Sequence, residues 1–207
     1  MKRLIFIISV TLLLSCKESP KFRLLDPDQT GIEFSNTITE SDSFHVMTYE
    51  YIYNGAGVGI GDFNTDGLQD IVFAGNQVAP RVYINEGGFR FRDISRNLPG
   101  LDNGQWYSSV TVADINNDRL PDIYLTSTAS KDSSRCMNRL WVNEGTSNGK
   151  DPSFSEKAEE YGIAENGQSV NATFFDYDLD GDMDLYVLNN TVNERMNTSY
   201  RQKITNG

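Results

Sequence analysis

Three stretches of the chain share one pattern of apolar and polar positions. Each stretch begins with a short apolar lead-in, continues through a polar loop of nine residues and ends in a short apolar exit. They cover residues 58–73, 110–125 and 172–187. Because the apolar parts are short, rich in β-branched and aromatic residues and without helical periodicity, the pattern predicts a strand on each side of every loop.

The first two copies of this repeat continue past their loops. Residues 81–87 (RVYINEG) match residues 139–145 (RLWVNEG), and Phe91 matches Phe154 in the strand that follows. Each unit therefore predicts four strands, and the loops that mark the units start at residues 62, 114 and 176. Four-stranded units at this spacing predict an all-β fold made of β-propeller blades, each with four antiparallel strands.

The repeat also divides the chain into segments, with about two and a half blades in all. The expected segments are a signal peptide (1–15), a lipidated tether (16–21), an N-terminal segment packing on the propeller (22–56), a first blade (57–100), a second blade (101–160) and an incomplete third blade (161–207). Since a propeller closes with about four to eight blades, we expect the start of a longer protein, and a complete small domain is the alternative. In the N-terminal segment, Leu24, Leu25, Ile32 and Phe34 are expected to pack against the propeller.

The first residues have the form of a secretory signal. Lys2 and Arg3 precede an uncharged run over residues 4–14, which is too short for the roughly 20 residues of a membrane-spanning helix. The run ends in Leu-Leu-Ser-Cys, which resembles the bacterial lipobox, so Cys16 is the expected lipid anchor. We therefore expect an exported, membrane-anchored bacterial lipoprotein at the outer membrane or cell surface. An ordinary signal peptide with a chance cysteine is the alternative.

The polar loops carry the candidate chemistry. Positions 1, 3, 5 and 9 have carboxylate or amide side chains, and the backbone carbonyl at position 7 adds a fifth oxygen. The predicted ligands are Asp62, Asn64, Asp66, Leu68 (carbonyl) and Asp70; Asp114, Asn116, Asp118, Leu120 (carbonyl) and Asp122; and Asp176, Asp178, Asp180, Asp182 (carbonyl) and Asp184. Calcium prefers 6 to 8 such hard oxygens in a flexible geometry, so up to three Ca²⁺ ions are expected. A polar turn without metal is the alternative.

Position 6 of each loop ranks the three expected sites. Gly67 and Gly181 suit the left-handed backbone that such a tight loop needs, whereas Arg119 adopts it at a cost of about 1 kcal/mol. The second loop is therefore expected to bind most weakly, and the third, which is richest in carboxylates, most tightly. An EF-hand is excluded, because its twelfth position is glutamate, whereas the third loop has Val187 there, inside an expected strand.

Composition narrows the classes of function. The net charge of −11 disfavours nucleic acid as a partner. With His45 alone and only Cys136 besides Cys16, a zinc site or a serine/histidine triad has too few residues. Cys136 is expected to be an incidental thiol in a polar insertion. The Tyr and Trp residues at strand positions are expected in the core, with a sugar-binding surface as the alternative.

The repeated loops resemble the FG-GAP or VCBS repeat of integrin α-subunit propellers and secreted bacterial proteins. More narrowly, residues 53–77 and 81–95 resemble bacterial surface lipoproteins related to cartilage acidic protein, whose propeller often precedes an ASPIC/UnbV module. The resemblance implies a calcium-bound propeller of about seven blades that binds a protein or glycan and is not an enzyme. The second loop departs from the family pattern, because position 6 is Arg119 instead of glycine. The alternative function is a polysaccharide-degrading, lyase-like enzyme with catalytic residues outside this chain.

Overall fold

The computed structural model describes residues 21–129, 136–146 and 150–190. The expected signal peptide and Cys16 lie outside these residues. No helix among them is long and apolar enough to cross a membrane.

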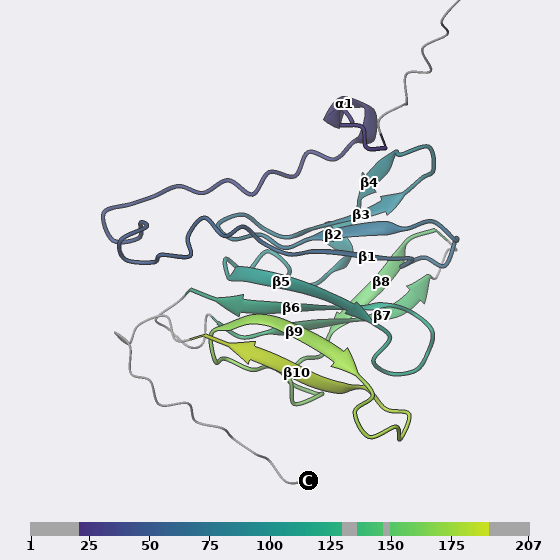
Figure 1. Ribbon diagram of the computed structural model, residues 1–207. Coiled ribbons are helices and arrows are strands. Elements are labelled where there is room, and N and C mark those ends of the chain that lie inside the picture. The colour runs from purple at the N-terminus through teal and green to yellow at the C-terminus, as the bar shows by residue number, and fades with distance from the viewer. Residues whose placement is uncertain (1–20, 130–135, 147–149, 191–207) are drawn as a thin grey trace, which may run out of the picture.

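Two four-stranded antiparallel sheets and one two-stranded sheet form the fold (Figure 1). The first sheet, in spatial order, contains β1 (Val58–Gly61), β2 (Asp70–Phe73), β3 (Arg81–Asn85) and β4 (Phe91–Asp93). The second contains β5 (Trp106–Ala113), β6 (Asp122–Thr128), β7 (Arg139–Thr146) and β8 (Pro152–Glu156). The third pairs β9 (Ser169–Phe175) with β10 (Asp184–Asn189). A short α1 (Pro27–Thr30) and a 3₁₀ turn, η1 (Ser95–Asn97), complete the described elements.

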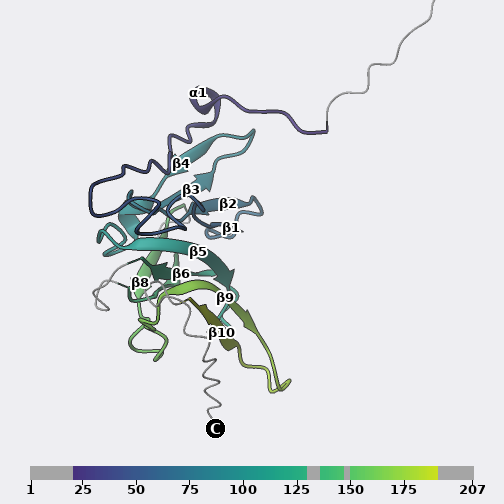
Figure 2. The same cartoon turned by 60° about the vertical axis from the view of Figure 1, so that its left-hand side comes forward.

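The predicted all-β fold is confirmed. Each four-stranded sheet joins consecutive strands in chain order, as in a propeller blade, and β9 and β10 form the same first hairpin in a third sheet. Figures 1 and 2 show the three sheets stacked in chain order, with β5–β8 between the other two.

Hydrophobic cores fill the two spaces between successive sheets. Strand β6 is buried along its whole length, and its side chains alternate between the two cores. Ile123 and Leu125 belong to the core shared with the first sheet, whereas Tyr124 belongs to the core shared with β9 and β10. The central sheet therefore holds its neighbours through both of its faces.

Two glycines allow the first sheet to approach the second. A Cβ atom on Gly57 would lie 2.5 Å from the Val110 backbone nitrogen, and one on Gly59 would lie 2.6 Å from Val110 Cγ1. Next to this contact, β5 reaches β9 through the Thr111 hydroxyl, which donates to the Ala172 carbonyl at 2.7 Å. The first strands of the three sheets consequently run side by side.

The N-terminal segment packs against β2 and the loop that follows it. Phe34 stacks on Phe73 with 4.9 Å between ring centroids, and Asn36 Nδ2 donates to Asn76 Oδ1 at 2.6 Å. The expectation that Leu24 packs against the propeller is wrong, because its side chain is 97% exposed. It precedes α1, where the chain has not yet reached the sheet.

The side chain of Cys136 is buried, although its neighbours in the sequence are polar. Its thiol accepts a hydrogen bond from Gln168 Nε2 at 3.3 Å. It lies just before β7 and against the segment that leads into β9. The polar residues around it in the sequence concealed this packing position.

Candidate metal-binding loops

The three acidic loops lie at one end of the stacked sheets. Each connects the first strand of its sheet to the second, so all three lie beyond the carboxyl ends of β1, β5 and β9 (right side of Figure 1). The second and third loops are in contact, since Asn117 Nδ2 donates to the Gly181 carbonyl at 3.1 Å. Eleven carboxylates are therefore gathered at one edge, at the positions that the sequence singled out.

The carboxylate at position 1 holds each loop in its turn. Asp62 Oδ1 accepts from the N–H of Asp66 at 3.0 Å, and its Oδ2 accepts from the N–H of Gly67 at 2.8 Å. Asp114 makes the same two contacts in the second loop, and Asp176 accepts from Gly181 in the third. Each carboxylate oxygen still has lone pairs for a cation, so these contacts orient the group without excluding metal.

The backbone of all three loops is left-handed at two positions. At position 6, φ is 85° for Gly67, 70° for Arg119 and 95° for Gly181, as the sequence predicts for that position. Position 4 is left-handed as well, at φ values of 58° for Thr65, 60° for Asn117 and 62° for Leu179. This second turn was missed, because no glycine marks it in the sequence. Only position 6 distinguishes the second loop, because it has Arg119 there and the other two loops have glycine.

The aspartate at position 9 has a structural role that its sequence position did not reveal. Asp70 is fully buried: its Oδ2 accepts from Phe63 N at 2.8 Å, and its Oδ1 accepts from Asn85 N at 2.8 Å. Asp122 bridges Ile115 and Asn143 in the same way. This carboxylate therefore ties the loop to the third strand of its own sheet.

Burial makes ionisation of these two aspartates unfavourable. It raises the pKa of Asp70 to about 6, and the nearby Asp66 and Asp62 carboxylates add to the rise. Burial likewise raises the pKa of Asp122 to about 6, with smaller contributions from Asp118 and Asp114. A cation bound among these groups would favour their charged forms.

The asparagines of the repeated Asn-Glu-Gly motif also support the loops. The backbone N–H of Asn85 donates to the position 9 carboxylate of the first loop, and that of Asn143 donates to the position 9 carboxylate of the second loop. The buried Asn143 side chain additionally donates to the Phe63 carbonyl in the first loop at 2.9 Å. The motif was recognised as part of the repeat, but its link to the neighbouring loop involves residues too far apart in the sequence to be inferred from it.

The third loop has the arrangement best suited to a cation. In the part of the chain that the structure describes, one group of three acidic side chains brings its oxygens within 4.8 Å of one another, and it consists of Asp176, Asp178 and Asp184. Asp176 Oδ1 is buried, and no group in the described parts of the chain forms a hydrogen bond with it. A shielded carboxylate oxygen without a donor is costly to bury, and a cation would satisfy it. These residues therefore fit a calcium ion.

The first two loops are less ready to bind. Asn64 Nδ2 donates to Asp66 Oδ2 at 2.9 Å, and Asn116 Nδ2 donates to Asp118 Oδ2 at 2.8 Å. A cation needs the amide oxygen instead, so each amide would have to turn over. The third loop has Asp178 at this position, which offers an oxygen in either orientation.

The remaining predicted ligands occupy the loop tips. Asp66, Asp118 and Asp180 each accept a hydrogen bond from the backbone N–H two residues later, donated by Leu68, Leu120 and Asp182 respectively. Asp180 lies outside the group of three acidic residues. The carbonyl ligands at position 7 and the full ligand sets remain predictions.

These features define a class of protein. Stacked four-stranded antiparallel sheets, each with an acidic loop between its first two strands, are those of a β-propeller repeat protein. Residues 62–125 match the family model of the FG-GAP-like repeat. These residues therefore contain an FG-GAP-like repeat, as the resemblance of the loops indicated.

Curated relatives extend the similarity. The chain is 33% identical over 136 residues to cartilage acidic protein 1 of Mus musculus, and 34% identical over 136 residues to the same protein of Homo sapiens. Each alignment covers 64% of this chain and 20% of the relative. The chain thus spans about a fifth of the length of these relatives.

Proposed function

We propose that this chain is a calcium-binding β-propeller module that acts in binding or adhesion and catalyses no reaction. The observation that carries the proposal is the group of Asp176, Asp178 and Asp184 with its unpartnered oxygen, placed in a loop that recurs in each sheet. The FG-GAP-like repeat and the relatives support a module of this type. Its partner would be a protein or a glycan, because the acidic chain repels phosphate backbones.

The role assigned to calcium is to stabilise the fold. Without a cation, the loop carboxylates repel one another, and two of them are buried. Extracellular calcium modules bind with dissociation constants of about 10⁻⁴ to 10⁻³ M. At roughly millimolar calcium, linkage gives about 0.4 to 1.4 kcal/mol of stabilisation for each occupied site. Three sites would then contribute a substantial part of a typical stability of about 5 to 15 kcal/mol.

Calcium is therefore expected to raise the melting temperature, and a chelator to lower it, by about 2 to 4 °C for each kcal/mol. The test is a calcium titration of Tm by differential scanning calorimetry. The matched variants are Asp176→Asn and Asp114→Asn, which neutralise position 1 of the third and second loops. Asp176→Asn should remove more of the calcium-dependent rise, because its loop has the assembled carboxylates.

Two results would count against these assignments in different ways. An unchanged Tm after chelation would refute the metal assignment itself. A larger loss of calcium response in Asp114→Asn would refute only the order of affinity among the loops.

We further propose that the protein is exported and held at a bacterial membrane by acylation of Cys16. The support is the short apolar run that ends in Leu-Leu-Ser-Cys. Labelled palmitate is expected to enter the wild-type chain and not Cys16→Ser, with Cys136→Ser as the matched control that keeps its label. Equal labelling of the wild type and Cys16→Ser would exclude the lipid anchor.

A further inference from the structure

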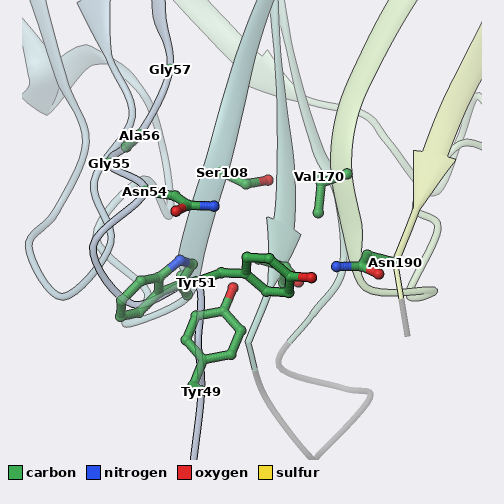
Figure 3. A pocket seen from close by; sticks show the side chains of 11 residues that line it. Tyr49, Tyr51, Asn54, Gly55, Ala56, Gly57, Ser108, Val170 and Asn190 are labelled. Atoms are coloured by element: carbon green, nitrogen blue, oxygen red, sulfur yellow. The ribbon is translucent and has the colours of Figure 1, made fainter. Parts of the chain in front are cut away.

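A pocket of about 350 Å³ lies at the end of the sheets opposite the acidic loops (Figure 3). Ser108 and Val170 contribute from the first residues of β5 and β9, and residues 54–57 contribute from the segment that leads into β1. The first strands of all three sheets therefore converge on it. Its volume lies at the lower end of the range of about 300 to 1,000 Å³ for small-molecule sites.

Aromatic rings form one wall of the pocket and hold one another in place. Tyr49 meets Trp106 edge to face, with centroids 5.7 Å apart and planes at 85°, and meets Tyr51 at 5.9 Å and 76°. Phe44 supports this cluster from behind, 5.3 Å from Trp106. Tyr49 is 6% exposed and Tyr51 is 38% exposed, so the cluster is anchored in the protein while the Tyr51 ring remains accessible.

Neutral polar groups complete the lining. Figure 3 shows the Asn54 and Asn190 amides on opposite sides of Tyr51, with Ser108 and Val170 beyond the ring. Thr128 adds a second hydroxyl. None of the eleven lining residues that the structure describes is charged, although the chain has a net charge of −11.

We propose that this pocket binds a neutral saccharide unit, such as the terminal residue of a glycan. A sugar ring presents an apolar C–H face, which can lie on the Tyr51 ring. Its hydroxyl groups both donate and accept hydrogen bonds, which matches the amides of Asn54 and Asn190. This inference rests on the proposed role as a binding module and assigns that role a site and a class of ligand.

Other classes of ligand would contact only the aromatic wall or only the neutral polar groups of the pocket. Among the described lining residues, a carboxylate or phosphate would find no cationic partner, and a primary amine would find no anionic one. A quaternary ammonium or a proline ring can contact the aromatic wall, but it donates no hydrogen bond to the polar groups of the lining. A neutral ligand rich in hydroxyls can contact the rings and also form hydrogen bonds with the polar groups of the lining.

The test is saturation-transfer NMR on the full chain in the presence of calcium chloride. The probes are the methyl glycosides of glucose, mannose, galactose and N-acetylglucosamine, with choline chloride and a hexaproline peptide as probes for the competing classes. At least one glycoside should bind, and Tyr51→Ala should weaken its affinity about tenfold. Asn54→Ala should weaken it about fivefold, through one lost hydrogen bond.

Tyr53→Ala is the matched control, because Tyr53 is 63% exposed and does not line the pocket. It should leave the affinity within about twofold of wild type. Far-UV circular dichroism and Tm verify that each variant is folded. Tyr51→Phe provides a milder change that keeps the ring and should retain most of the binding.

The outcomes separate this inference from the function on which it rests. Glycoside binding that survives Tyr51→Ala, or is lost equally in Tyr53→Ala, overturns the pocket assignment. Binding of choline or hexaproline alone overturns the saccharide and leaves a binding module. If no probe binds while Tm still responds to calcium, the saccharide is refuted and the calcium-binding proposal stands. If neither response is seen, both fail.

Discussion

Trp141→Ala is expected to destabilise the protein by about 3 to 5 kcal/mol, as measured by urea unfolding followed by far-UV circular dichroism. Trp141 on β7 is fully buried in the core between the first two sheets. Its ring lies 6.5 Å from that of Tyr107, and its Nε1 donates to the Pro99 carbonyl at 2.9 Å. Truncation would empty the largest side-chain volume in this core and leave a carbonyl without its donor.

Two further variants test why Trp141→Ala is destabilising, one by keeping an aromatic ring and one by removing an exposed ring as a control. Trp141→Phe keeps an aromatic ring and loses the hydrogen bond, so about 1 to 3 kcal/mol should be lost. Tyr186→Ala removes a ring that is 59% exposed on β10 and should change the stability by less than about 0.5 kcal/mol. A cost of under about 1 kcal/mol for Trp141→Ala would show that the first two sheets do not depend on a shared core.

The strands could be predicted from the sequence because their signals are local. The nine-residue spacing of acidic positions fixes where β1 ends and β2 begins, and Asp70 is the first residue of β2. The repeated motif ending in Asn-Glu-Gly likewise placed the third strand, since Asn85 ends β3 and Asn143 lies within β7. Because the units repeat, the four strands predicted for one unit also predict four strands in the next.

Contacts between sheets could not be predicted in this way. The Asn143 amide reaches the carbonyl of Phe63, which lies 80 residues earlier. Gly57 and Gly59 do not lie in a turn. They are needed because β5 packs so closely against them that a side chain would not fit. Such features depend on how successive sheets pack, and no local pattern encodes that packing.

The burial of the aromatic residues was also predicted only in part. Strand position predicted core locations for Tyr and Trp, and this is correct for Trp141, which is fully buried within β7. Trp106 instead begins β5, is only partly buried and lines the pocket beside Tyr49 and Tyr51. Trp106 lies at the end of its strand, where the N-terminal segment packs against it, whereas Trp141 lies inside its strand. The hydrophobic pattern does not show where the N-terminal segment packs.

Asn143→Ala is expected to cost about 2 to 4 kcal/mol, a large effect for the loss of one amide. The side chain is fully buried. Its Nδ2 donates to the carbonyls of Phe63 at 2.9 Å and Pro121 at 3.3 Å, and its Oδ1 accepts from the Gly145 N–H at 2.9 Å. Alanine would leave these backbone groups unpaired, and the loss would fall on the contact that joins the second sheet to the first acidic loop.

Asn85→Ala is the matched control, because Asn85 occupies the same place in the first sheet. Its amide donates to the Gln69 carbonyl at 3.0 Å and accepts from the Gly87 N–H at 2.9 Å, and both partners lie in its own sheet and its connections. We expect this variant to lose about 0.5 to 1.5 kcal/mol in urea unfolding. The difference between the two variants then measures what the bond to Phe63 contributes to joining the sheets. Equal losses would show that the motif stabilises each sheet separately and that the link to Phe63 contributes nothing.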